Sequence, residues 1–151
     1  MTIGLICTRD TVVVRRDDSI FTAAKLMREH HVGSVVVVDD TAAGVKPVGV
    51  LTDRDMVVEI IAMELDPHTV TVGDVMSYDL VTAREHYGIW GTLKRMRSQG
   101  IRRLPVINDA GLLMGIISVD DLLELLVGEL TDLVKLTGRE KEREILKRNN
   151  G

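Results

Sequence analysis

Two short segments of the sequence place a carboxylate three positions after a hydroxyl residue, and both groups can take part in binding chemistry. The segments are Gly49-Val50-Leu51-Thr52-Asp53-Arg54-Asp55 and Gly115-Ile116-Ile117-Ser118-Val119-Asp120-Asp121. In each, a glycine and two aliphatic residues predict a short buried strand, and the hydroxyl residue predicts the start of a helix. The free N–H groups and the dipole at a helix start favour an anion. The same residues also predict a capping box, which binds no ligand.

The two segments belong to a longer internal repeat, which sets the elements that position them. Residues of the first half recur 69 positions later, and after the middle hairpin the offset is 66. The identical pairs include Gly4/Gly73, Asp10/Asp79, Val12/Val81, Arg15/Arg84, Ile20/Ile89, Lys25/Lys94, Met27/Met96, Arg28/Arg97 and Val37/Val106. The chain is therefore a tandem duplication.

Hydrophobic periodicity predicts a β-α-β-β-α unit in each copy. Extended segments are expected at 11–14 and 80–83, helices from Ile20 and Ile89, and strands at 35–38 and 104–107, with turns at 39–44 and 108–111. The first closing helix is expected to end at Asp66-Pro67-His68 because proline cannot continue it. After Asp121 a leucine-rich helix is expected to break or bend at Gly138, before a charged stretch at 139–148.

Composition limits the class of protein. The chain has 151 residues and 45% hydrophobic content, enough for one compact domain or for two small halves sharing a core. Its net charge of −4 argues against a nucleic-acid partner. The single cysteine, Cys7, excludes an intramolecular disulfide, indicates a reducing compartment and is expected to be buried like an apolar residue. With no leader or membrane-length apolar run, we expect a cytoplasmic protein without a membrane partner.

The sequence gives little support for catalysis. His30 and His31 are adjacent on a predicted helix and point to different faces, so they make a poor pair of metal ligands. The neighbouring acids Asp120 and Asp121 also diverge, and no nucleophile elbow or Walker-type loop is present. We expect a protein that is not an enzyme, with neither catalytic nor metal-ligating residues.

The duplicated Gly-aliphatic-aliphatic-Thr/Ser-x-x-Asp junctions, with Gly100-Ile101-Arg102-Arg103-Leu104-Pro105-Val106 in the second copy, resemble a tandem pair of CBS domains (a Bateman module). The chain looks like a stand-alone bacterial protein of this family. The resemblance implies an α/β (α+β) fold in which two repeats, 1–69 and 70–127, pack about a pseudo-twofold axis, followed by a C-terminal helical extension at 128–151. It also implies two clefts that bind adenosine-containing ligands such as AMP, ADP, ATP or S-adenosylmethionine. In the family, the Thr/Ser lies near phosphate and the Asp binds ribose hydroxyls.

The resemblance assigns residues to both clefts. Cleft A would combine Thr52, Arg54, Asp55, Leu80, Val81, Ile101, Arg102 and Arg103. Cleft B would combine Thr11, Val12, Val32, Gly33, Ser34, Ser118, Asp120 and Asp121. Guanidinium groups suit phosphate, so we expect an adenine nucleotide in cleft A. Cleft B is expected to be empty or to hold a neutral or cationic adenosine compound.

The function that follows is a regulatory module that senses an adenosine-containing ligand and signals to an unidentified protein by conformational change. The alternative is a scaffold for dimerisation or protein interaction whose clefts are vestigial. The resemblance implies a homodimer formed through the helices of the repeats. Two apolar faces suit this role, namely Met56, Val57, Ile60 and Ile61, and Leu122, Leu123, Leu125 and Leu126. Trp90 is expected in the core, with the dimer surface as the alternative.

Overall fold

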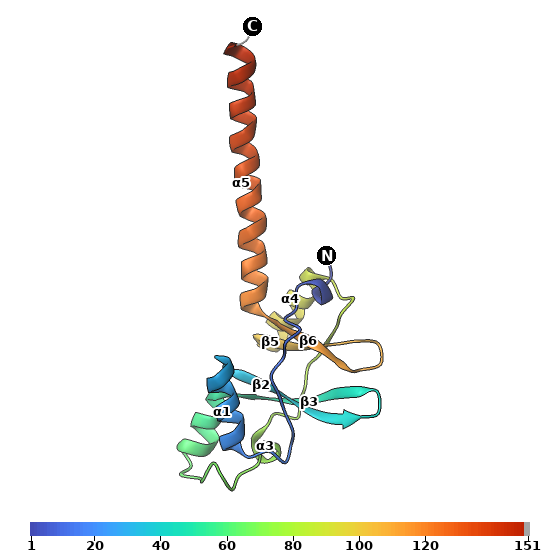
Figure 1. Cartoon of the computed structure of the whole chain (residues 1–151), viewed down its shortest axis with the longest axis vertical. Coiled ribbons are helices and arrows are strands. Elements are labelled where there is room, and N and C mark those ends of the chain that lie inside the picture. Colours follow the sequence, from blue (N-terminus) through green and yellow to red (C-terminus); the bar gives the residue numbers. More distant parts are fainter. Residues whose placement is uncertain (150–151) are drawn as a thin grey trace. The chain divides into compact units, whose positions relative to one another are not determined.

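The computed structural model describes residues 1–149, and its element order repeats once along the chain (Figure 1). The first repeat contains β1 (Val13–Val14), α1 (Ile20–His30), β2 (Ser34–Thr41), β3 (Gly44–Thr52) and α2 (Asp53–Met56), continued by the π-helical η2 (Val57–Ile61). The second contains β4 (Ala83–Arg84), α4 (Ile89–Gln99), β5 (Arg103–Ile107), β6 (Leu113–Ser118) and α5 (Val119–Asn149). A short helix precedes each repeat, η1 (Ile3–Leu5) and α3 (Val72–Val75). The predicted β-α-β-β-α unit and the mixed α+β class are confirmed.

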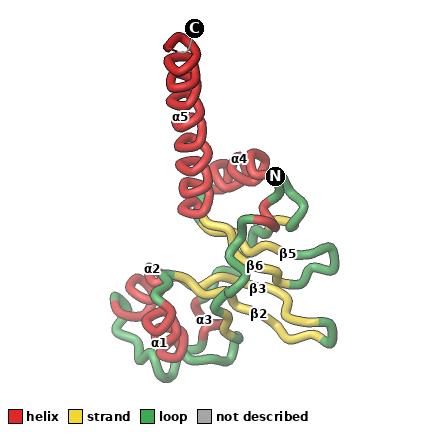
Figure 2. Tube along the Cα trace, turned by 45° about the horizontal axis from the view of Figure 1, so that its top comes forward, coloured by secondary structure: helices red, strands yellow, loops and turns green. Residues whose placement is uncertain are grey.

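Each repeat builds a three-stranded sheet, in the orders β1-β2-β3 and β4-β5-β6. The first and second strands of each sheet are parallel, and β2 pairs with β3 as an antiparallel hairpin. Both views place the β2–β3 hairpin beside the β5–β6 hairpin (Figures 1 and 2). Val35 to Val38 are all buried, although successive strand residues face opposite sides. The central strand of the first sheet is therefore covered on both faces, as a run of consecutive valines predicts.

The segment that precedes each repeat is bonded to the other repeat. Four backbone bonds carry this exchange, from N–H to carbonyl oxygen: Ile3 to Tyr87 (2.9 Å), Gly4 to Glu85 (2.9 Å), Val72 to Asp18 (2.8 Å) and Gly73 to Arg16 (2.9 Å). The second pair of bonds repeats the first at the offset of the sequence duplication. The exchange is reciprocal, as expected for two repeats about a pseudo-twofold axis, and residues Met1–Ile117 form one compact unit. A second unit begins at Ser118 and contains α5.

Two predicted helix ends are wrong. Helix α5 continues through Gly138 without a break (Figure 1). A single helical glycine costs only about 1 kcal/mol relative to alanine, and the flanking Glu, Lys, Arg and Leu residues favour the helix. The first closing helix ends at Ile61, before Asp66-Pro67, because a turn with Glu64 at a φ of 54° follows it. Among the described helices, none is both long and apolar enough to cross a bilayer.

Trp90 was expected in the core, and this prediction is wrong because 63% of the residue is exposed. Ile89, Thr92 and Met96 form the buried face of α4, and a residue one position after Ile89 is turned by about 100° from that face. Phe21, at the equivalent position of α1, is also exposed, and its ring stacks on His68 with 4.3 Å between centroids. Cys7 is buried, as predicted.

Candidate ligand-binding site

The junction between β3 and α2 is a complete capping box. Asp55 N–H donates to Thr52 Oγ1 (3.2 Å), and Thr52 N–H donates to Asp55 Oδ2 (2.8 Å). The same pattern recurs at the second junction, where Asp121 N–H donates to Ser118 Oγ and Ser118 N–H to Asp121 Oδ2. The predicted cap is confirmed at both positions. The cap bond uses one oxygen of the Asp55 carboxylate, so the other oxygen can still accept a hydrogen bond from a ligand.

A pocket of about 500 Å³ opens at the first junction. All eight residues that the resemblance assigns to cleft A line it: Thr52, Arg54, Asp55, Leu80, Val81, Ile101, Arg102 and Arg103. Thr52 ends β3, and Arg54 and Asp55 lie in the α2 that follows it. Leu80 and Val81 lie in the chain before β4, Ile101 and Arg102 in the turn between α4 and β5, and Arg103 begins β5. The structure thus brings together groups from both repeats that lie up to 51 positions apart in the chain.

Six further lining residues were not assigned to cleft A: Ser34, Val50, Asp53, Ser77, Asp79 and Gly100. Two of them carried a signal in the sequence. Asp79 repeats Asp10 just before a predicted strand, and Gly100 directly precedes the Ile101-Arg102-Arg103 run. Ser34 was assigned to cleft B, but it lines this pocket because it pairs with Thr52 across β2 and β3.

The pocket combines three kinds of surface. Arg54, Arg102 and Arg103 supply guanidinium groups, and three aspartates, Asp53, Asp55 and Asp79, supply carboxylates. Asp53 Oδ1 accepts from Arg54 N–H at 2.8 Å, so part of its acceptor capacity is used in the first turn of α2. Val50, Leu80, Val81 and Ile101 supply apolar walls. Such a pocket can pack a flat apolar ring, accept bonds from hydroxyl groups and bind an anion.

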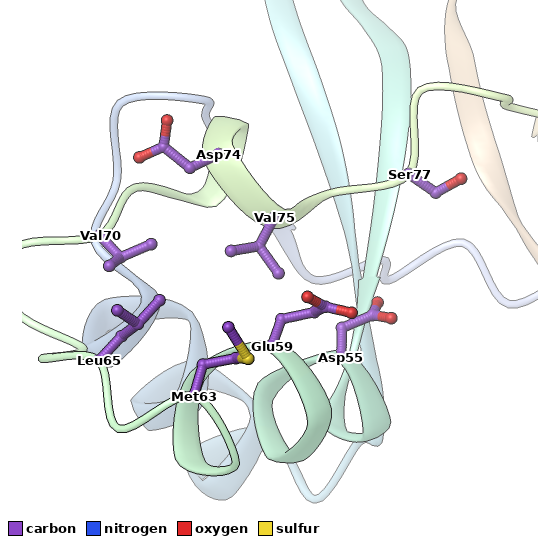
Figure 3. Close-up of a pocket in the computed structure, with 8 residues that line it drawn as sticks. All are labelled: Asp55, Glu59, Met63, Leu65, Val70, Asp74, Val75 and Ser77. Carbon is purple, nitrogen blue, oxygen red and sulfur yellow. The ribbon is translucent and has the colours of Figure 1, made fainter.

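A second hollow, of about 300 Å³, lies beside the first and shares Asp55 and Ser77 with it (Figure 3). The carboxylates of Asp55 and Glu59 lie close together on one helical face, while Asp74 points away from them (Figure 3). Asp74 accepts from the N–H and the hydroxyl of Thr71, and these bonds lower the pKa of its carboxyl. Among the described residues no group of three or more His, Cys, Asp or Glu side chains could hold a metal ion.

The residues assigned to cleft B are divided between the two units. Thr11, Val12, Val32, Gly33 and Ser34 lie in the unit Met1–Ile117, and Ser118, Asp120 and Asp121 lie in the unit that begins at Ser118. Within the first unit, the Gly33 carbonyl accepts from Asp53 N–H at 3.0 Å. Gly33 is therefore held at the β3–α2 junction. Cleft B stays a prediction.

The predicted dimer faces are only partly exposed. In the first, Val57 and Ile61 are exposed, whereas Ile60 is buried and Met56 packs against the core. In the second, Leu122 is buried and Leu123 is exposed. The helical period explains the division, since adjacent apolar residues of one helix cannot all face solvent or all face the core.

Comparison with known proteins agrees with the duplicated architecture. The CBS domain model matches residues 3–62 and 72–128. Protein MK0525 of Methanopyrus kandleri is 33% identical over 125 residues, which is 83% of this chain and 62% of that protein. The CBS domain-containing protein YhcV of Bacillus subtilis is 36% identical over 115 residues, covering 76% of this chain and 78% of its own.

Solved structures give the same result. The crystal structure of Hypoxic Response Protein I with two coordinated zinc ions superposes with a TM-score of 0.72 at 31% identity, covering 82% of this chain and 98% of that one. A conserved protein from Pyrococcus horikoshii superposes with a TM-score of 0.72 at 28% identity, covering 82% and 90%. The chain belongs to the CBS domain family, as a tandem pair of the kind that serves as a regulatory, non-catalytic module.

Proposed function

We propose that this protein is a regulatory module that binds an adenosine-containing ligand in the pocket at the β3–α2 junction and signals by conformational change. One observation carries the proposal: a single pocket of about 500 Å³ combines apolar walls, carboxylates and three guanidinium groups. This volume lies within the usual range of small-molecule sites, roughly 300–1,000 Å³. Because both repeats line the pocket, a ligand favours the relative placement of the repeats that closes best around it.

Each part of the ligand has a partner of suitable chemistry. Leu80, Val81 and Ile101 pack against the adenine ring. The carboxylate of Asp55 accepts from the ribose hydroxyls, and Arg102 and Arg103 bind phosphate. Three carboxylates balance the three guanidinium groups, and we favour AMP, ADP or ATP over S-adenosylmethionine because only the nucleotides carry a phosphate for Arg102 and Arg103 to bind. The CBS pair of protein MJ0100, crystallised with 5′-methylthioadenosine and S-adenosylmethionine, has a TM-score of 0.73 at 24% identity. That likeness concerns the fold, so the choice of ligand rests on the pocket.

The proposal extends to the assembly. We place the repeats at 1–69 and 70–127 and the extension at 128–151, and expect a cytoplasmic homodimer formed through the helices of the repeats. The exposed Val57 and Ile61 support an interface on the first repeat. A related protein, the CBS-CP12 protein of bloom-forming cyanobacteria, is hexameric and superposes with a TM-score of 0.71 at 29% identity. Cleft B is expected to be empty or to hold a neutral or cationic adenosine compound.

The scaffold function stays as a second candidate because of the capping boxes. At both junctions the hydroxyl and one carboxylate oxygen already bond the backbone. If these bonds were their whole role, the pocket would be vestigial, and the protein would act through its exposed apolar helices.

The test is calorimetric titration of AMP, ADP, ATP and S-adenosylmethionine into protein freed of bound nucleotide. Asp55→Ala is compared with its repeat counterpart Asp121→Ala, because both remove a cap and only the first removes a pocket carboxylate. Arg103→Gln removes a pocket guanidinium without touching either cap, and Arg95→Gln on α4 removes an exposed one outside the pocket. A lost charge-assisted hydrogen bond should weaken binding about 10- to 100-fold.

Nucleotide binding that is lost in Asp55→Ala, weakened in Arg103→Gln and retained in Asp121→Ala and Arg95→Gln supports the proposal. Loss only in Asp121→Ala moves the ligand to cleft B and overturns the site. No heat from any of the four compounds, with the protein folded, makes the scaffold the better function.

A further inference from the structure

Helix α5 carries an apolar stripe, consisting of Leu123, Val127, Leu130 and Val134, that is independent of the ligand pocket. Between 53% and 71% of each of these residues is exposed. Their spacing of four, three and four residues is that of alternating d and a positions in a heptad. Such a seam is typically buried against a second helix, because exposed aliphatic residues in register favour association.

The surface of the stripe has the shape that a facing helix needs. Val127, Leu130, Thr131 and Val134 enclose a shallow hollow of about 260 Å³. Four residues at i, i+3, i+4 and i+7 form the hole that receives one knob side chain in coiled-coil packing. The hydroxyl of Thr131 donates to the Val127 carbonyl (2.7 Å), so this polar group is satisfied without water. The hollow therefore suits an aliphatic knob.

The charges along α5 distinguish the two possible orientations of a second copy. In a parallel pair each residue meets its own copy, so the seam positions would stack Asp120 on Asp120, Lys141 on Lys141 and Glu144 on Glu144. An antiparallel pair centred near Gly128 avoids these layers and leaves 139–149 beyond the paired segment. It also sets the two helix dipoles in opposition.

We propose that α5 pairs with α5 of a second copy in antiparallel orientation, in the register that faces Leu123 with the second copy's Val134. In this register Val127 lies against the second copy's Leu130, and Val127 of that copy enters the hollow beside Thr131. Leu126 and Leu133 flank the seam and extend its apolar surface. The stripes of the two copies thus cover each other, so the partner of α5 is a second molecule of this protein.

The oligomeric state of the full chain tests the surface. Leu130→Glu places a charge in the seam, whereas Leu136→Glu places the same charge on the same helix away from the seam. The two residues are matched, with 61% and 56% exposed. Light scattering after gel filtration over a series of dilutions should find that Leu130→Glu lowers the particle mass at concentrations at which the wild type and Leu136→Glu keep theirs. Circular dichroism and urea unfolding should find both variants folded.

Disulfide trapping tests the orientation in a Cys7→Ala background. Chains carrying Leu123→Cys are mixed with chains carrying Val134→Cys and oxidised. The antiparallel register joins 123 to 134 and keeps two copies of residue 123 roughly 16 Å apart along the axis, beyond the reach of a disulfide. Cross-links between 123 and 134, and none between two copies of 123, are expected. A 123–123 cross-link, a Leu130→Glu variant that keeps the wild-type mass at every dilution, or a monomeric wild type that Leu130→Glu destabilises would each overturn the proposal.

Discussion

His31 and Gly100 occupy the same position in the two repeats, and the backbone conformation there favours glycine. Each ends the first helix of its repeat in the left-handed region, with φ values of 54° and 65°. For an L-residue this region costs about 1–2 kcal/mol, whereas glycine enters it freely. Because both positions are exposed, side-chain packing contributes little to the difference. The first repeat therefore carries backbone strain that the second avoids.

We expect His31→Gly to raise the free energy of unfolding by about 0.5–1 kcal/mol, since the relief of strain exceeds the added entropy of the unfolded chain. Gly100→Ala should lower it by a similar amount. Urea unfolding followed by circular dichroism measures both. An unchanged or lower midpoint for His31→Gly would contradict the strain at this helix end.

At the scale of elements, two glycines allow the segment that precedes one repeat to approach the last strand of the other repeat's sheet. A Cβ on Gly49 would lie 2.7 Å from the Ser77 carbonyl oxygen, and one on Gly115 would lie 2.6 Å from that of Thr8. Isolated bridges form at the same places, between Val50 and Ser77 and between Thr8 and Ile116. These glycines begin the two segments in which the hydroxyl and carboxylate residues lie. Close backbone approach is thus required beside both junctions.

Gly49→Ala should lower the free energy of unfolding by about 1–3 kcal/mol, because backbone atoms must move to accept the methyl group. Gly91→Ala is the matched control: it lies in α4 with open space around its Cβ position. There the same substitution should raise stability by up to about 1 kcal/mol through helix propensity. Thermal unfolding of the two variants gives the comparison, and equal shifts of the same sign would refute the close approach.

The repeat explains why much of the fold could be predicted from the sequence. Because the offset is constant, each element predicted in one copy also predicts its counterpart in the other, and the family resemblance assigned Arg54, Leu80 and Arg102 to one cleft. Two predictions that depended on a single local residue were wrong. Gly138 was expected to break a helix that its neighbours sustain, and Trp90 was placed in the core although it lies one position beyond the buried face. Ser77 entered the pocket through tertiary pairing, which local sequence does not contain.

For the whole molecule, the exchange of preceding segments ties each repeat to the other end of the unit. Ile3 is fully buried and bonds Tyr87 of the second repeat, whereas its counterpart Val72 lies in the core of the first repeat with Val14 and Ile20. Each repeat's stability therefore depends on residues that the duplication places before the other repeat. Any displacement of one repeat therefore also acts on the segment that the other repeat binds.

This exchange predicts a crossed pattern of local unfolding. Ile3→Ala should lower stability by about 2–5 kcal/mol and weaken amide protection mainly in residues 83–117, which follow it by some eighty positions. Val72→Ala should weaken protection mainly in residues 13–52, which precede it. Leu5→Ala, in the same segment as Ile3 but 78% exposed, should change little. Hydrogen exchange read by mass spectrometry separates the two regions. An equal loss of amide protection in both regions, in both variants, would contradict the crossed pattern. It would mean that the two repeats unfold together as one cooperative unit, to which the exchanged segments contribute as a whole.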